Sequence, residues 1–200
     1  MPMVADVLRY ADVRPAEIAG VAVSSGPGSY TGLRIGVSTA KGLAAALDAK
    51  LIAVPSLLAL ADRLRPGTRR NDRIAAAFDA RRDAVYAALY RSNEAGALEA
   101  LSEAKNVRAG EVADWLEDDN EGSLYLVGDG WTKLQGVLMD VPHRFVPDEL
   151  GLPSAVSVAR IGADKLRRGA VEDVVTFEPY YLRDFVAMKP SATAFEKLQF

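Results

Sequence analysis

The 200-residue chain has no cysteine and a single histidine, His143. It therefore has no disulfide and no thiolate ligand or nucleophile, and metal sites or triads built on histidine are nearly excluded. It also lacks a run of about eighteen apolar residues and a secretory signal at its start, so we expect a cytoplasmic protein without a membrane segment. The formal net charge of −3 provides no global field that attracts nucleic acid.

Half of the residues (50%) are hydrophobic and 26% are charged, as in a globular chain. Up to residue 64, helix-like and strand-like hydrophobic patterns alternate, which predicts an α/β architecture with at least partly parallel strands. The predicted elements are a helix at 1–13, a strand at 18–23, a helix at 29–47, a strand at 50–56 and a helix at 57–64.

The polar stretch RPGTRRND, residues 65–72, is suited to a linker. Beyond it, the pattern predicts a hairpin of residues 73–80 and 84–91, a third strand at 97–105, a helix at 109–116, a strand at 124–130 and a helix at 154–168. We therefore expect two α/β lobes, residues 1–66 and 73–200, and allow for the last segment to pack back across the lobes.

The turn SSGPGSYTG, residues 24–32, joins a strand to a helix, and it can be interpreted as a phosphate-binding turn or as a purely structural one. Glycines and the unpaired N–H groups of a helix start can bind phosphate, here at Gly26, Gly28 and Ser29. The Walker A and dinucleotide patterns are both incomplete. We therefore favour a turn that only sets the strand-to-helix geometry, with Ser29 or Thr31 as the N-cap.

The helix at 29–47 carries small residues at every fourth position, Gly32, Gly36 and Ala40. Each interior glycine costs about 1 kcal/mol relative to alanine, so another backbone is expected to approach closely in compensation. Most of the helix circumference is apolar. The helix is therefore either sandwiched inside its own lobe or, with the first helix, faces a partner chain, and periodicity does not separate these alternatives.

Other charged residues are weaker candidates. His143 stands between a proline and an arginine, which is typical of a loop residue rather than a ligand or base. Asp79 with Arg81, Arg82 and Asp83 favours a hairpin turn over a catalytic cluster, and Asp129 between two glycines favours a turn. Five arginines could contact RNA phosphates, although a solvated linker is favoured: Arg63, Arg65, Arg69, Arg70 and Arg73.

The segment SSGPGSYTGLRIGVSTAKGLAAAL, residues 24–47, resembles the signature of the TsaB (YeaZ) family. Later segments are similar to the family in the same order: FDARRDAVYAALY at 78–90, Gly-Asp-Gly at 128–130 and PYYLRD at 179–184. The resemblance implies a two-lobed, actin-like fold of the ribonuclease H-like kind, which belongs to the actin/hexokinase/Hsp70 (ASKHA) ATPase-like superfamily.

The same resemblance implies a subunit that does no chemistry alone. Such proteins pair with a TsaD-like catalytic subunit and a TsaE-like ATPase to place threonylcarbamoyl on the adenosine beside the anticodon of tRNAs that read codons beginning with A. The tRNA is then met indirectly through the complex. No cofactor of its own is expected, and ATP or ADP is a candidate ligand at the junction with TsaD.

The first two long helices are implied to contact TsaD, and the same face can form a homodimer. The residues carried over to this interface are Val4, Val7, Leu8, Gly32, Leu33, Gly36, Val37, Ala40 and Lys41.

One departure concerns the start of the chain. Family members begin with an apolar strand and an Asp-Thr-Ser turn that this sequence does not contain, so we expect an incomplete first lobe with an open sheet edge and a tendency to self-associate. The alternative function is an independent ATP-dependent enzyme, of small-molecule kinase type, on the same fold. It would need an acidic phosphate-binding turn and a catalytic carboxylate, which the sequence does not display.

Overall fold

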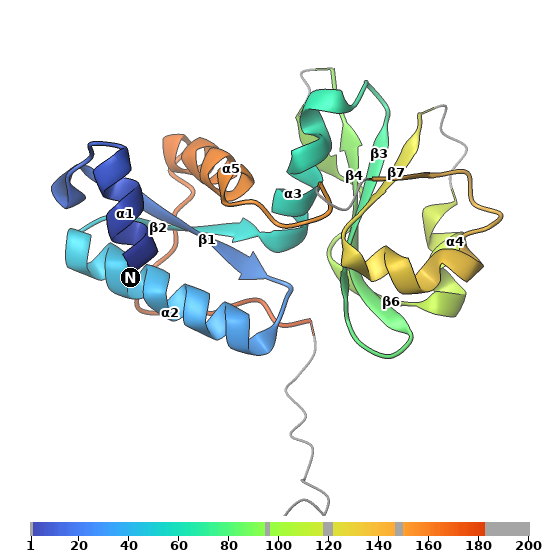
Figure 1. Cartoon of the computed structure of the whole chain (residues 1–200), viewed down its shortest axis with the longest axis horizontal. Helices are drawn as coiled ribbons and strands as arrows, with labels where there is room; N and C mark the ends of the chain where they lie inside the picture. The colour runs from blue at the N-terminus through green and yellow to red at the C-terminus, as the bar shows by residue number, and fades with distance from the viewer. Residues whose placement is uncertain (1, 95–96, 118–121, 147–149, 183–200) are drawn as a thin grey trace, which may run out of the picture.

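The computed structural model describes residues 2–94, 97–117, 122–146 and 150–182. Two β-sheets, each with its own helices, lie side by side in Figure 1. We call the β1–β2 sheet with its helices the first half, and the six-stranded sheet with its helices the second half. Within the described residues, no helix is long and apolar enough to cross a membrane.

The first half is built on two parallel strands, β1 (Gly20–Gly26) and β2 (Lys50–Pro55). The helix α2 (Tyr30–Leu47) covers one face of this sheet, and α5 (Ala155–Arg167) covers the other (Figure 1). Successive side chains of a strand point to opposite faces, so Val21 and Val23 pack towards α2 and Ala22 towards α5. On its other edge, β1 has no ladder partner within the described residues.

Both ends of α2 follow from single residues. Ser29 is the N-cap, and its Oγ accepts a hydrogen bond from the backbone N–H of Gly32 at 3.3 Å. Asp48 ends the helix in a left-handed conformation with φ 51°. These boundaries confirm the prediction for this helix.

Short helical elements lie on both sides of the β1–α2–β2 unit. The helix α1 (Pro2–Tyr10) is followed by a 3₁₀ turn, η1 (Pro15–Glu17). After β2, α3 (Ser56–Ala61) continues directly into a second 3₁₀ segment, η2 (Asp62–Gly67). The stretch predicted as a linker therefore begins as helix and leads into the second sheet.

Among the residues that the structure describes, the second half contains six strands in the order β5-β4-β3-β7-β8, with β6 also pairing with β4. Their bounds are β3 (Arg73–Asp79), β4 (Ala84–Ser92), β5 (Leu98–Ala100), β6 (Lys105–Arg108), β7 (Leu124–Val127) and β8 (Arg144–Phe145). The predicted β3–β4 hairpin is antiparallel, whereas β3, β7 and β8 run parallel. Side chains of α3 pack on one face of this sheet. The other face is covered by η3 (Ala109–Glu111), α4 (Val112–Leu116) and η4 (Asp129–Val137).

The third strand predicted at 97–105 is two strands instead. β5 and β6 pair with different stretches of the same edge of β4. Between them, the backbone N–H groups of Leu101 and Ser102 both point to the carbonyl of Leu89, while the Ser102 hydroxyl accepts the Leu89 N–H at 3.0 Å. This side-chain bond replaces a ladder bond and interrupts the strand.

The helix α5 follows the second sheet in the chain but packs on the first. Gly162 allows this contact, because a Cβ at that position would lie 2.5 Å from the Cβ of Ala22. The segment at 170–182 then returns along the first half. The Glu172 N–H binds the Leu51 carbonyl at 2.8 Å, and the Tyr180 N–H binds the Ser25 carbonyl at 2.7 Å. Residues 155–182 therefore pack on the first half, although they follow the second sheet in the chain.

Candidate functional site

A pocket of about 690 Å³ lies between the two halves. Its first wall is the turn between β1 and α2 with the first turns of α2, including Gly28 and Ser29. Its second wall comes from the end of β3 and the start of η4, including Asp79, Arg81 and Asp129. The structure thus brings the glycine turn and the charged hairpin, which are far apart in the sequence, to one cavity.

Gly26, the first glycine of the predicted phosphate-binding turn, makes close contacts with other parts of the chain. Gly26, whose peptide to Pro27 is cis, has φ 117°, and a Cβ there would lie 2.3 Å from the Tyr180 carbonyl oxygen. Its N–H donates to Ser56 Oγ at 3.1 Å. Gly26 is therefore needed for the close approach of residue 180 and does not line the pocket. Of the predicted phosphate-binding residues, Gly28 and Ser29 alone line it.

Asp79 on the opposite wall is held by several donors. It forms an ion pair with Lys133 and accepts the Arg81 N–H at 2.7 Å, while its own N–H donates to the Asp129 carboxylate at 3.1 Å. The hydrogen bond from the Lys133 ammonium is the main reason that the pKa of the Asp79 carboxyl lies below its usual range. This carboxylate is ionised and engaged, which makes it a poor general base near neutral pH.

The described residues contain no group of three or more His, Cys, Asp or Glu side chains that could hold a metal ion. His143 is a half-buried loop residue whose Nδ1 lies 2.5 Å from the Val141 carbonyl oxygen and whose ring meets Phe145 edge-on. The pocket therefore offers a cavity, a helix start and an engaged carboxylate, but no assembled nucleophile and base in the part of the chain described.

The first predicted interface helix, α1, buries none of its residues. It lies on the first half, at the end remote from the second sheet (Figure 1). Val7 is 65% exposed, Met3 and Tyr10 are exposed further, and Val4 and Leu8 are half-buried. An amphipathic helix normally buries its apolar face, so this one presents an apolar surface without a partner among the described residues.

The second predicted interface helix, α2, requires a correction. Leu33, Val37 and Ala40 are buried against the strands of their own sheet, with Val37 only 3% exposed. Lys41 donates to the carbonyls of Val175 and Phe177 at 3.0 and 2.9 Å. These four residues hold the first half together, because the inner face of α2 is the sandwiched one.

The remaining predicted residues of α2 lie nearer its surface. Gly32 is exposed, and Gly36 is half-buried with Val23 Cγ2 3.9 Å from where a Cβ would stand. Two further positions of α2, outside the predicted set, are open to solvent: Ile35 is 64% exposed, and no atom lies within 4 Å of a Cβ added at Gly42. They are seven residues apart and therefore lie on one face of the helix.

Comparison with known proteins places the chain in a family. Residues 1–191 match the family model described as TsaD, tRNA N6-adenosine threonylcarbamoyltransferase. The Escherichia coli protein named tRNA threonylcarbamoyladenosine biosynthesis protein TsaB is 32% identical over 94% of this chain and 81% of its own length. The Bacillus subtilis protein of the same name is 44% identical over 58% of this chain and 48% of its own.

Solved structures agree with these sequence matches. A Pseudomonas aeruginosa crystal structure, described as similar to peptidase YeaZ, has a TM-score of 0.77 and 30% identity, covering 91% of this chain and 82% of that one. The YeaZ structure from the same organism has a TM-score of 0.76. Since the family model spans nearly the whole chain, and the E. coli TsaB protein is 32% identical over 81% of its own length, the chain belongs to the TsaB (YeaZ) family, within the wider TsaD-like family.

Proposed function

We propose that this protein is a non-catalytic subunit of the machinery that makes threonylcarbamoyladenosine in tRNA. It pairs with a TsaD-like catalytic subunit and works with a TsaE-like ATPase, and the assembled complex modifies the adenosine beside the anticodon in tRNAs that read codons beginning with A. The observation that carries the proposal is the apolar surface of α1, where no residue is buried and Val7 is 65% exposed. The assignment to threonylcarbamoyladenosine synthesis is supported by its relatives, which are named for that process.

We also propose that the protein catalyses no reaction by itself. This proposal is supported by Asp79, whose carboxylate is bound by Lys133 and the Arg81 N–H on the wall of the main pocket. With one histidine and no cysteine in the whole chain, few other groups are suited to acid–base or nucleophilic work. The same proposal treats the two halves as the lobes of an actin-like fold, with ATP or ADP bound at the junction with TsaD.

Pairing is tested by co-purifying the full chain with its cognate TsaD and measuring tRNA threonylcarbamoylation with and without this protein. Val7→Asp, which puts a charge on the α1 surface, should abolish co-purification and reduce modification to the level of TsaD alone. Val156→Asp is the matched control, because Val156 is a 76% exposed helical valine on α5. A TsaD that neither binds the wild-type chain nor needs it would contradict the proposal.

A second candidate is an independent ATP-dependent enzyme, favoured by the pocket of about 690 Å³ with the start of α2 in its wall. ATP turnover by the isolated chain separates the two functions. Substrate-dependent hydrolysis that needs no partner would support the enzyme, whereas hydrolysis at background level supports the subunit.

A homodimer formed through the α1 surface is expected to be lost with the same Val7→Asp variant.

A further inference from the structure

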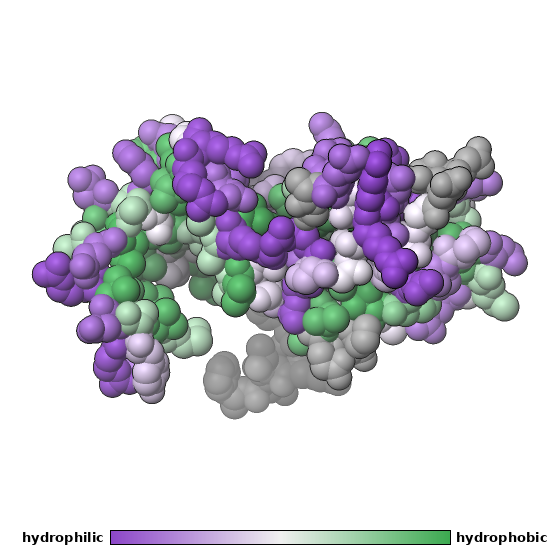
Figure 2. Space-filling model, turned by 90° about the horizontal axis from the view of Figure 1, so that it is seen from above, coloured by the Kyte–Doolittle hydropathy of each residue, from purple (hydrophilic) through white to green (hydrophobic). Residues whose placement is uncertain are grey.

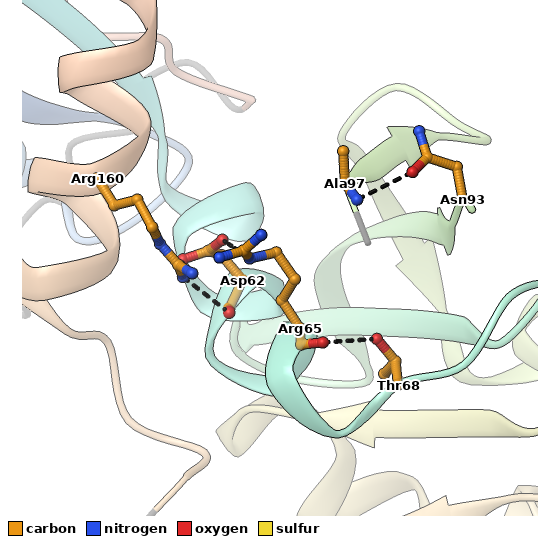
Figure 3. A network of polar contacts seen from close by, with 6 residues as sticks. All are labelled: Asp62, Arg65, Thr68, Asn93, Ala97 and Arg160. Carbon is orange, nitrogen blue, oxygen red and sulfur yellow. Dashed lines mark hydrogen bonds and ion pairs between the residues drawn. The ribbon is translucent and has the colours of Figure 1, made fainter. Parts of the chain in front are cut away.

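The five arginines at 63–73 have different surroundings in the folded chain. Arg63 donates to the Leu152 carbonyl at 2.7 Å. Arg65 lies 3.7 Å from the Asp62 carboxylate, towards which Arg160 also points (Figure 3). Arg63 and Arg65 therefore already have partners within the chain.

Arg73 is withdrawn from solvent. Its side chain is buried, and Nη1 donates to the Leu116 carbonyl at 3.0 Å. Arg69 and Arg70 are exposed, and they line a second cavity of about 450 Å³. We call this cavity the polar hollow; it is lined by Gly67, Arg69, Arg70, Asn71, Asp72, Gly122, Ser123, Tyr125 and Arg144.

The polar hollow lies where the parallel strands β3, β7 and β8 begin. This end of the second half faces the viewer in Figure 2, where hydrophilic residues gather over it. Two loops form its floor and are locked together. A Cβ on Gly122 would lie 2.0 Å from the Asn71 carbonyl oxygen, so no other residue fits without moving the backbone.

Asp72 completes the floor and is fully engaged there. Its carboxylate accepts the Arg69 N–H at 2.8 Å and the Ser123 N–H at 3.0 Å, one on each oxygen, and the residue is buried. Both oxygens accept backbone N–H groups, so Asp72 joins the two loops, and its hydrogen bonds are not made to the arginine side chains. The hollow is thus preformed by backbone contacts.

Three guanidinium groups remain around this floor. Arg70 pairs with Glu94 at 2.7 Å, but both side chains are more than half exposed, and such surface pairs are weak. Within the described residues, the side chains of Arg69 and Arg144 have no hydrogen bond or ion pair. Three arginines and one aspartate line the hollow, so positive charge is in excess there, and a bound anion offsets this excess.

Arg144 comes from a part of the chain that the arginine run does not include. It is the register partner of Tyr125 across β7 and β8, so the two side chains lie on the same side of the sheet. A planar guanidinium fork matches phosphate oxygens, and an aromatic ring beside it is common where RNA is bound.

We infer that the polar hollow binds a phosphate group of an RNA backbone directly, with Arg69 and Arg144 as the principal donors. The arginines are exposed at the rim, so a phosphate held between them keeps its neighbouring nucleotides in solvent, as a continuous strand requires. This inference rests on the proposed function, which brings tRNA to the complex. It adds a direct contact from this subunit.

The test measures binding of a labelled tRNA transcript to the full chain, alone and with its TsaD partner, over a range of salt concentrations. The double variant Arg69→Gln/Arg144→Gln should bind about tenfold more weakly, and its salt slope should fall by about one to two. Arg168→Gln removes an exposed arginine outside the hollow and should change neither quantity. Thermal unfolding should match the wild type, because both substituted side chains are exposed.

Unchanged affinity and salt slope in the double variant, or no RNA binding by the wild type in either form, would overturn the inference. Competition with pyrophosphate distinguishes the source of the phosphate. If the double variant loses pyrophosphate binding but keeps RNA binding, the hollow is a small-anion site and the RNA contact is wrong. If the wild type binds RNA but does not co-purify with TsaD, the proposed function fails while the hollow's role stands.

Discussion

The helices α1 and α2 share an amphipathic sequence pattern, but they differ in how much of their apolar surface the rest of the chain buries. Both are amphipathic, yet α2 packs Leu33, Val37 and Ala40 on its own sheet, whereas α1 buries no residue. The helical period shows that a face is apolar, but it does not show whether the chain itself or another molecule covers that face. The difference assigns stability to the inner face of α2, and it leaves α1 with the exposed apolar surface on which the proposed pairing depends.

The largest effect should come from a charge on the inner face of α2. Val37→Asp buries a carboxylate without a partner and should reduce the free energy of unfolding by about 3–5 kcal/mol. Denaturant unfolding measures this loss. Val7→Asp on α1 makes the same change at a 65% exposed site and should leave the unfolding free energy within about 0.5 kcal/mol of the wild type. Similar losses in both variants would break the comparison.

A smaller effect should distinguish the outer face of α2 from its inner face. Gly42→Leu adds a side chain where nothing lies within 4 Å, and it replaces a helical glycine. We expect the isolated chain to become more stable by about 0.5–1 kcal/mol, because leucine favours the helix. If this face lies at the TsaD interface, co-purification should weaken at least about tenfold. A stabilised variant that still pairs normally would confine the interface to α1.

The smallest effects concern local bonds in the two helices. Ser29→Ala removes the cap of α2 and should cost about 1 kcal/mol. Asp6→Ala removes the exposed Asp6–Arg9 ion pair of α1, 2.9 Å long, and should cost less than about 0.5 kcal/mol. Thermal melts of both variants and of Ser29→Asp, which keeps a cap, provide the measurement. An equal loss in the alanine variants would contradict a structural role specific to α2.

Local signals predicted the elements well. Ser29 and Asp48 fixed the ends of α2, and the turn at 81–83 indicated the β3–β4 hairpin, because caps and turns depend on nearby residues. The sheet that α5 covers was not predictable, since an amphipathic pattern does not specify its partner. The interruption between β5 and β6 depends on a hydrogen bond from the Leu89 N–H in β4 to the Ser102 hydroxyl, thirteen residues away in the segment between those two strands.

The sites show the same limit. The glycine turn was found from the sequence, but its opposite wall at Asp79 and Asp129 required the fold. In the arginine run, the sequence did not separate Arg73, which is buried, from Arg69, which is exposed. Arg144 lines the same hollow as Arg69 because the parallel register of β7 and β8 places it beside Tyr125, and sequence patterns do not specify that register.

The return of α5 and residues 170–182 to the first sheet has a consequence for the order of folding. Gly162 meets Ala22, and Tyr180 meets Ser25, so the first half depends on contacts between distant parts of the chain. The strands of the second half lie between these parts, at residues 73–145. During synthesis from the N-terminus, the second half can therefore form while the first sheet is covered by α2 on one face and still lacks α5 and residues 170–182.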